Sequence, residues 1–305
     1  HNCVMIINDK YWLNDSGFTI ISKIPDKLKN QYLSYYMYYF LNNNDMNFQT
    51  LYRGSGQQNI DFNQFELLNI PIPSIEIQDQ VIEKLNDLSN QKKLLSDRQL
   101  GIVRQMKYYF EMQTKRNELE VKNLEELIKI NIGSTPSTKN NSYWNNGTHV
   151  WLTIAELNNN LIPIVDSDKK ITDLAVSEKK PLIVKKGSIL VSFKLSIGKL
   201  GIAGCDLYTN EAILHVNTDN EELNKYLYYH FMCIPIHNNA SGCMGGGSLN
   251  KEKLKDLKIL IQKDSNKQKE MVSYLDNLEN KKMDIITEIN NIDLLMKDIM
   301  EQSYY

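Results

Sequence analysis

The chain has 305 residues, a formal net charge of −2, 42% hydrophobic residues and 24% charged residues. This length allows two domains, and the composition is that of an ordinary globular protein. The near-neutral charge gives no overall positive field for nucleic acid, although it is compatible with a local basic patch. The apolar runs are short and interrupted, which predicts no membrane span, and the four scattered cysteines predict neither disulfides nor zinc. These features fit a cytoplasmic protein.

The N-terminal region contains an aromatic-rich segment. Residues 30–40 (NQYLSYYMYYF) predict a helix whose tyrosines serve helix packing rather than a base-stacking platform. Residues 54–73 then combine a glycine-rich turn, an asparagine leading into a short helix, and a β-rich run. Together they predict a small folded unit ahead of a long helix.

Residues 77–116 predict a long helix whose seam positions alternate between four- and three-residue spacing. The pattern returns 190 positions later, within residues 265–305, and Lys92 and Lys282 interrupt the two seams at the same place. A 3.5-residue period over four heptads is typical of a coiled coil, so we expect the two helices to pack antiparallel with pseudo-twofold symmetry. The predicted interface residues are Leu85, Leu88, Lys92, Leu95, Ile102, Met106, Leu275, Leu278, Lys282, Ile285, Ile289, Ile292 and Met296.

Between the two long helices, the sequence predicts an α+β domain. The alternation of Ile189, Val191 and Phe193 predicts a half-buried strand, and Trp144 and Trp151 are expected to be core anchors. The domain ends with the segments NKYLYYHFMCI (224–234) and GGGSLNKEKLKDLKILIQ (245–262), which repeat the order found in the N-terminal region. The N-terminal copy has no counterpart for most of residues 124–200, so we expect its first half to be missing.

Sequence motifs for catalysis are not found. The chain has neither the [DNS]PP[YFW] loop of DNA methyltransferases nor the acidic metal ligands of a PD-(D/E)xK nuclease, and its five histidines show no metal-binding spacing. The glycine-rich segment GCMGGGS (242–248) lacks the lysine that a Walker A loop needs to reach the phosphates of a nucleotide. We therefore expect no catalytic residue, no cofactor and no metal.

The second domain contains an ordered set of motifs, namely Gly133 with Pro136, Tyr143-Trp144, KGSILV (186–191), SIGK (196–199) and NEA (210–212). This set resembles that of one protein family, the specificity subunits of type I restriction-modification systems. Glu211 departs from the pattern, since the family usually has glutamine there, and the proline–glutamine signature of Pro73 and Gln78 is degraded in the second copy.

This resemblance implies an α+β fold in which target-recognition domains are joined by two long antiparallel coiled-coil helices. It also implies a chain that catalyses nothing, with two domains that each read half of a bipartite site in double-stranded DNA. The helices would dock two methyltransferase subunits together with a restriction subunit. The expected segments are 1–76 (the C-terminal part of the first recognition domain), 77–116 (long helix), 117–264 (second recognition domain) and 265–305 (long helix).

DNA contacts divide into those that hold phosphates and those that read bases. Phosphate contacts are expected from backbone N–H groups and side chains at Gly245, Gly246, Gly247, Ser248, Lys251, Lys194 and Lys199. The matching positions of the first copy are Arg53, Ser55, Gln57, Gln58 and Asn59. Base contacts are expected from Thr135, Ser137, Thr138, Lys139, Asn140 and Tyr143. The alternative for each is a solvated loop, and for the glycines a purely structural turn.

Two other functions remain open on the sequence. The chain is also compatible with the C-terminal recognition region of a fused single-chain restriction-methylation enzyme. It is equally compatible with a coiled-coil scaffold that joins protein partners without DNA. Whatever the function, two chains can pair through the coiled coil to form a homodimer.

Overall fold

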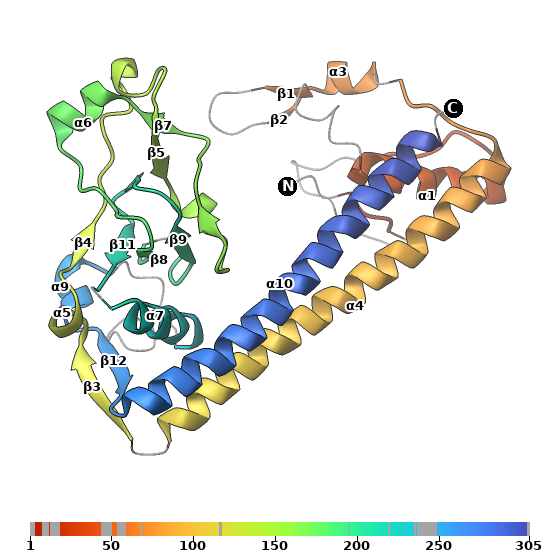
Figure 1. Cartoon of the computed structure of the whole chain (residues 1–305). Coiled ribbons are helices and arrows are strands. Elements are labelled where there is room, and N and C mark those ends of the chain that lie inside the picture. The colour runs from red at the N-terminus through yellow and green to blue at the C-terminus, as the bar shows by residue number, and fades with distance from the viewer. Residues whose placement is uncertain are drawn as a thin grey trace. The chain divides into compact units, whose positions relative to one another are not determined.

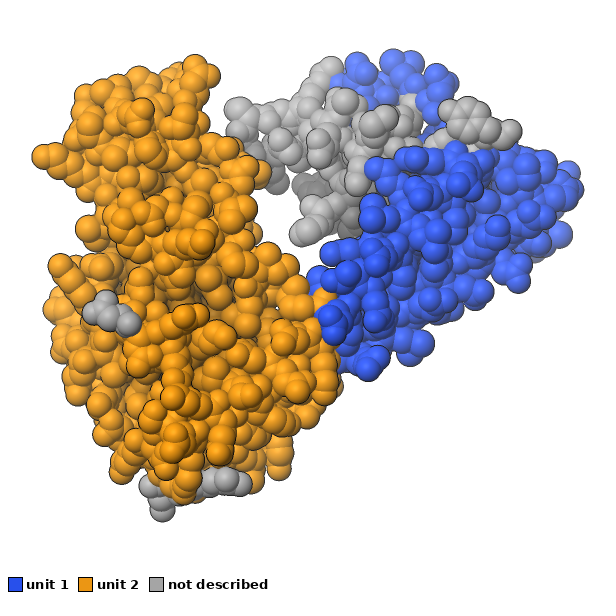
Figure 2. Space-filling model, viewed as in Figure 1, with its two compact units in different colours: residues 1–99, 284–305 blue, residues 100–283 orange. Residues whose placement is uncertain are grey.

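The computed structural model describes residues 4–7, 12, 19–43, 51–53, 59–67, 69–115, 118–194, 196–218, 220–234, 236 and 249–303. The fold is α+β, as predicted, and divides into two compact units (Figure 2). The first comprises His1–Gln99 with Asp284–Tyr305, and the second comprises Leu100–Met283. Each unit therefore contains a part of both long helices. No helix in the described part of the chain is long and apolar enough to cross a membrane.

The two long helices are α4 (Ile75–Thr114) and α10 (Ser265–Gln302), and they run antiparallel (Figure 1). In the first unit, Lys92 of α4 contacts Asp293 of α10, and in the second unit Tyr109 packs on Tyr274. Every predicted interface residue is buried or half-buried. The helix α4 begins two residues before the predicted start, just after Pro73, whose carbonyl oxygen accepts a hydrogen bond from Gln78 Nε2 (2.8 Å).

The first unit is built around α1 (Lys27–Asn43), whose tyrosines pack against the long helices. Tyr36 is fully buried and its hydroxyl lies 3.0 Å from Ser303 Oγ, while the Tyr39 hydroxyl donates to Asn86 Oδ1 (2.6 Å). Burial is the main reason why the pKa of Tyr39 rises to about 12. The prediction that these tyrosines serve helix packing is confirmed.

A short pair of antiparallel strands, β1 (Tyr52–Arg53) and β2 (Asn59–Ile60), precedes α3 (Phe62–Glu66). The short helix predicted after Asn59 is present, but its N-cap is Asp61, because Asn59 pairs with Arg53 in the strand pair. Aspartate caps a helix as well as asparagine does, since its carboxylate accepts from free N–H groups of the first turn.

In the second copy, the capping asparagine is where it was expected. The Asn250 side chain accepts a hydrogen bond from Lys253 N (2.9 Å) at the start of α9 (Lys251–Lys255). The β-rich run that follows is β12 (Lys258–Gln262), which pairs antiparallel with β3 (Leu119–Asn123).

The second unit contains two larger sheets. The five-stranded sheet has the order β4 (Asn131–Ile132), β11 (Ile213–Val216), β8 (Ile189–Ser192), β9 (Leu200–Ala203) and β6 (Pro163–Ile164). The three-stranded sheet has the order β10 (Tyr208–Thr209), β5 (His149–Leu152) and β7 (Lys170–Ile171). The helices are α5 (Leu124–Leu127), α6 (Asp173–Lys179) and α7 (Glu221–Cys233), with 3₁₀ turns η2 (Asn141–Tyr143) and η3 (Ile154–Glu156).

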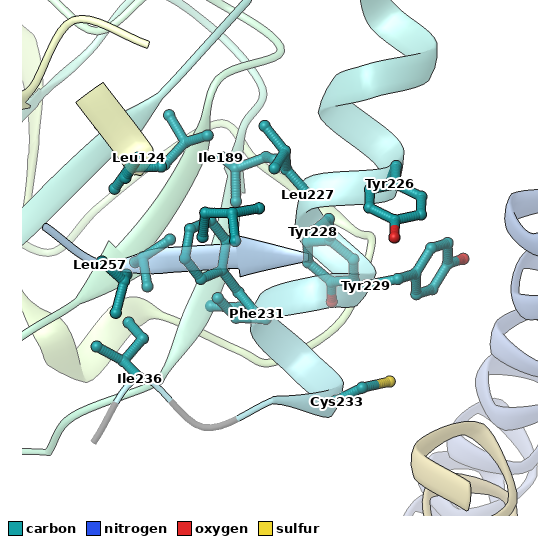
Figure 3. Packing of buried hydrophobic residues seen from close by; sticks show 14 of the residues in the cluster. Leu124, Ile189, Tyr226, Leu227, Tyr228, Tyr229, Phe231, Cys233, Ile236 and Leu257 are labelled. Carbon is teal, nitrogen blue, oxygen red and sulfur yellow. The ribbon is translucent and has the colours of Figure 1, made fainter. Parts of the chain in front are cut away.

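Strand β8 is buried on both faces, so the prediction of a half-buried strand was wrong. It lies between β11 and β9, and all four of its residues are buried. Ile189 and Val191 belong to the cluster that includes α7, whereas Leu190 belongs to a second cluster on the other face. Figure 3 shows Ile189 beside Leu227 of α7. An inner strand that is covered on both sides needs apolar residues at successive positions.

Helix α7 forms the centre of the larger core (Figure 3). Its buried Tyr226 hydroxyl donates to Leu260 O (2.8 Å), and the His230 Nε2 atom accepts from Leu260 N (3.0 Å). Desolvation lowers the pKa of His230 to about 4, so its imidazole is neutral at physiological pH. The aromatic run of this copy, like that of the first, serves packing.

Candidate nucleic-acid interface

Three loops of the second unit meet at one end of the five-stranded sheet. They are residues 133–140 after β4, residues 193–199 between β8 and β9, and residues 210–212 before β11. Backbone hydrogen bonds join them: Phe193 N donates to Ala212 O (3.0 Å). Because all three loops leave strands of two packed sheets, their positions are fixed by the core rather than by the loops themselves.

Gly133 allows the first loop to lie against the strand end at Thr209. A Cβ atom at Gly133 would lie 2.2 Å from Thr209 O and 2.3 Å from Asn210 O, which no side chain can accept. The adjacent Ser134 N donates to Thr209 O (2.9 Å). The glycine of the sequence motif therefore has a packing role, which is to bring the first loop against the third.

Polar side chains from each loop come together at Glu211. The Thr135 hydroxyl donates to Glu211 Oε2 (2.5 Å), and this bond is the main reason why the pKa of Glu211 is lowered. The charge of Lys194 contributes in the same direction, although less. The Lys194 ammonium also lies 5.5 Å from the centroid of the Phe193 ring. The carboxylate of Glu211 and the hydroxyl of Thr135 are exposed, and the half-buried Lys194 ammonium lies near enough to the carboxylate to lower its pKa.

The loop that carries Lys194 and Lys199 is held by Ser192, which is fully buried. The Ser192 hydroxyl donates to Ser196 O (2.5 Å) and accepts from Lys199 N (2.8 Å). Gly198 completes the turn with a φ of +89°, a conformation that favours glycine. The backbone positions of both lysines are therefore defined from within the protein. Sequence reasoning missed Ser192, whose only signal was its place at the end of an apolar strand.

Two tryptophans donate hydrogen bonds to backbone carbonyl groups of the first loop. Trp144 Nε1 donates to Ser137 O (3.1 Å) and Trp151 Nε1 donates to Ser134 O (3.2 Å). Their rings meet edge to face at 4.9 Å, and Trp151 is buried. The prediction that both are core anchors is confirmed for Trp151, and Trp144 packs against the same cluster. The polar residues of this loop are exposed, namely Thr135, Ser137, Thr138, Lys139 and Asn140.

Tyr143 and Asn140 differ from the other predicted base-reading residues. The Tyr143 ring is buried and its hydroxyl donates to Glu178 Oε2 (2.5 Å), so this side chain offers no free polar group to a ligand. The Asn140 Oδ1 atom caps η2 by accepting from Ser142 N (3.2 Å) and Ser142 Oγ (2.7 Å). Asn140 keeps its amide N–H₂ group for other partners.

Comparison with known proteins identifies the family. Residues 3–102 and 116–293 match the family model described as the type I restriction modification DNA specificity domain. The chain belongs to this family. The two matched segments correspond to the two copies of the repeat, and the second match contains all three loops.

The chain is also similar to individual proteins. The chain is 31% identical over 186 residues to the MjaIX specificity subunit of Methanocaldococcus jannaschii, an alignment that covers 57% of this chain and 43% of that protein. The chain thus spans less than half of the length of this curated relative. The crystal structure of the type I restriction-modification S subunit from M. genitalium shares the fold, with a TM-score of 0.51, 12% identity, and coverage of 88% of this chain and 72% of that one. The HsdS subunit from Thermoanaerobacter tengcongensis gives a TM-score of 0.48 with 14% identity, over 89% of this chain and 70% of that one.

The remaining sequence-predicted positions are not part of the three loops. Lys251 is exposed in the first turn of α9. Arg53 and Asn59 belong to the first unit, where their backbones pair in β1 and β2. The positions Gly245, Gly246, Gly247, Ser248, Ser55, Gln57 and Gln58 lie outside the described residues. Of the predicted residues, Thr135 and Lys194 both interact with Glu211. Glu211 itself was not among the residues predicted to contact DNA.

Proposed function

We propose that this chain is a DNA-recognition component of a type I restriction-modification complex and that it catalyses no reaction itself. Its second unit binds double-stranded DNA through the loops 133–140 and 193–199. The observation that carries this proposal is the meeting of Thr135, Lys194 and Glu211, from three different loops, on a rigid sheet end in a member of the specificity family. Membership in the family supports this class of function, and the loop geometry supports the choice of this surface.

The chemistry of the loops suits both kinds of DNA contact. Lys194 and Lys199 supply ammonium groups for phosphates, and a contact of this kind is independent of sequence, whereas Lys139 supplies an ammonium group that can donate to a base. Thr135, Ser137 and Thr138 supply hydroxyls, which can donate to or accept from base edges. Glu211 is the acceptor-only group of the cluster, and a carboxylate in the major groove accepts from the amino group of cytosine.

The remaining predicted phosphate contacts form a second part of the proposal. Lys251, in the first turn of α9, follows the glycine-rich segment closely in the sequence, and together with Gly245, Gly246, Gly247 and Ser248 it would hold a phosphate. In the first copy, Arg53, Ser55, Gln57, Gln58 and Asn59 would do the same for the other half of a bipartite site.

The coiled coil supports a bipartite site and a set of protein partners. Helix α4 has 40 residues, which corresponds to about 60 Å at 1.5 Å per residue. This exceeds one turn of DNA, about 34–36 Å, so a spacer that the protein does not read is a natural consequence. The outer faces of α4 and α10 are the proposed docking surfaces for two methyltransferase subunits and a restriction subunit.

Fluorescence anisotropy with a random-sequence 40-base-pair duplex tests the proposal, using the full chain with and without a methyltransferase subunit. Replacing Lys194 and Lys199 by alanine is expected to weaken binding. It should also reduce the slope of log affinity against log salt concentration by the amount expected for the loss of about two phosphate contacts. The matched control is Lys186→Ala, because Lys186 is exposed at the opposite end of β8.

Two results would contradict the proposal. Absence of binding by the wild-type chain, even with the methyltransferase subunit, favours the coiled-coil scaffold that joins proteins without DNA. An equal effect of the Lys186 variant and the double variant would show that the two loop lysines have no special role.

A further inference from the structure

Lys282 is a seam residue of α10 and is only 3% exposed, an unusual place for an ammonium group. Its Nζ atom lies 2.6 Å from Glu279 Oε1, one turn earlier in the same helix, and Glu279 is fully buried. The repeat-related Lys92 is different. Its side chain is 40% exposed and pairs across the coiled coil with Asp293. The two copies of the seam lysine therefore have different partners and different environments.

Stability of the coiled coil does not account for the buried pair. Taking two charges out of water costs several kcal/mol for each ion, and apolar residues of similar size usually serve a core as well or better. Among the described residues, Lys282 is the cation that lies against the Glu279 carboxylate. A third contact distinguishes this lysine: its Nζ donates to the backbone carbonyl oxygen of Asn159 (3.1 Å), outside the coiled coil.

Two polar groups of Asn159 form hydrogen bonds with the backbone of Leu200. Its backbone N donates to Leu200 O (2.9 Å), and its side-chain Oδ1 accepts from Leu200 N (2.8 Å). Its φ of +55° lies in the left-handed region, which asparagine adopts more readily than most residues. Asn159 thus satisfies both backbone groups of the first residue of β9, and Lys282 holds the one carbonyl group that remains.

Leu200 directly follows the loop that carries Lys194 and Lys199. That loop is fixed at its start by Ser192 at the end of β8, and at its end by Leu200 bound to Asn159. A continuous series of contacts therefore runs from Glu279 and Lys282, through Asn159 and Leu200, to Lys199. All of these residues belong to the second unit.

We propose that Lys282 is a positioning residue for DNA binding: through Asn159 it fixes the end of the loop that presents Lys199. This inference rests on the proposed DNA-binding function of that loop. The buried lysine of the seam would then set the geometry of a recognition loop, while Glu279, one turn earlier in the same helix, pairs with its ammonium group.

The test is a variant that removes the contact without leaving a buried unpaired charge. The double variant Glu279→Leu/Lys282→Met makes both positions apolar, so the melting temperature should be maintained or raised. Water can replace Lys282 at the Asn159 carbonyl, because Asn159 is exposed. The matched control is Lys92→Met/Asp293→Asn, which removes the repeat-related ion pair and touches no recognition loop.

Amide hydrogen exchange of the full chain is the first readout. Faster exchange confined to residues 159–162 and 196–203, at an unchanged melting temperature, is expected for the double variant and not for the control. Unchanged exchange in these segments would overturn the inference. If the melting temperature instead falls and exchange rises throughout the second unit, the pair serves general stability and the inference is likewise overturned.

A double-mutant cycle with Lys199→Ala is the second readout, by anisotropy on the random-sequence 40-base-pair duplex. If Lys282 acts through the loop, each change alone weakens binding on the order of fivefold, and the combination weakens it by clearly less than the product. Additive effects would overturn the inference while leaving DNA binding intact. Absence of binding by the wild-type chain, in contrast, would contradict the proposed function itself.

Discussion

The hydroxyl group of Thr135 donates to the carboxylate of Glu211 across 2.5 Å, which joins two loops that are 76 positions apart in the chain. The Thr135 hydrogen bond, and to a smaller extent the charge of Lys194, lower the pKa of Glu211, so its carboxylate is ionised at physiological pH and offsets part of the positive charge of the loops. In the proposed DNA-binding function, Glu211 would oppose phosphate binding unless it contacts a base.

We therefore expect Glu211→Gln to increase DNA affinity. Glutamine keeps an oxygen that accepts from Thr135 but removes one negative charge beside Lys194, so affinity for random-sequence duplex should rise about three- to tenfold at low salt. Anisotropy over a salt series measures the affinity. The control is Glu156→Gln, because the Glu156 carboxylate accepts a hydrogen bond from Thr153 N, the N-cap residue of its own 3₁₀ turn. Weaker binding by the variant would show that Glu211 accepts a hydrogen bond from the DNA.

Gly133→Ala is expected to destabilise the second unit strongly. The new methyl group would lie 2.2 Å from Thr209 O, a backbone atom that cannot move without breaking the contact between the loops. A loss of about 2–4 kcal/mol in the free energy of unfolding follows from such overpacking. Urea denaturation measures it. In the control Gly101→Ala, no atom lies within 4 Å and the residue is helical, so a gain of about 0.5–1 kcal/mol is expected.

Acidification is expected to destabilise the protein before its carboxylates titrate. Burial lowers the pKa of His215 and of His230 to about 4. The unfolded chain, with a histidine pKa near 6.5, then binds more protons than the folded chain, so stability falls as pH drops from about 6.5 toward 4. Each histidine contributes a loss of about 2 kcal/mol at pH 5.

Urea denaturation between pH 7 and pH 5 measures this effect, and His215→Gln serves as the comparison. The His215 Nε2 atom lies 2.8 Å from Thr209 Oγ1, and a glutamine amide can replace that hydrogen bond without titrating. The difference in unfolding free energy between pH 7 and pH 5 should therefore shrink in the variant. An unchanged difference would mean that His215 is not the titrating group.

Leu85→Ala tests the coiled-coil seam of the first unit. Leu85 is fully buried and belongs to the cluster of α1 tyrosines, α4 and α10. Truncation should cost about 2–5 kcal/mol, because it removes buried methyl groups and leaves a cavity. The control is Leu94→Ala in the same helix, since Leu94 is 70% exposed and should cost less than about 0.5 kcal/mol. Equal losses in thermal unfolding would contradict the assigned seam.

The sequence was most informative where structure depends on local periodicity. The seam from Leu85 to Met106 and its repeat from Leu275 to Met296 could be read directly, because a 3.5-residue period is a property of one helix. The glycine at 133 and the tryptophans at 144 and 151 were also found, although the reason for Gly133 required the position of Thr209.

What the sequence did not reveal depends on contacts between distant segments. Leu190 is apolar like its neighbours, but only the order of strands shows that it packs into a different cluster from Ile189. The bond between Thr135 and Glu211, and the contact of Lys282 with Asn159 across 123 positions, follow from how the sheet and helices come together. The periodicity identified Lys282 as a polar interruption of the seam, but it could not predict the contact of Lys282 with Asn159.

The different environments of Lys92 and Lys282 have a consequence for protein engineering. A chimera that exchanges residues 117–264 for the equivalent region of another family member would keep α10 and its buried lysine. The incoming domain must then supply a carbonyl oxygen at the position of Asn159. Otherwise the desolvated Lys282 ammonium group keeps only its contact with Glu279. Exchange of the domain together with α10 avoids this mismatch, so the natural module for transplantation is larger than the recognition domain.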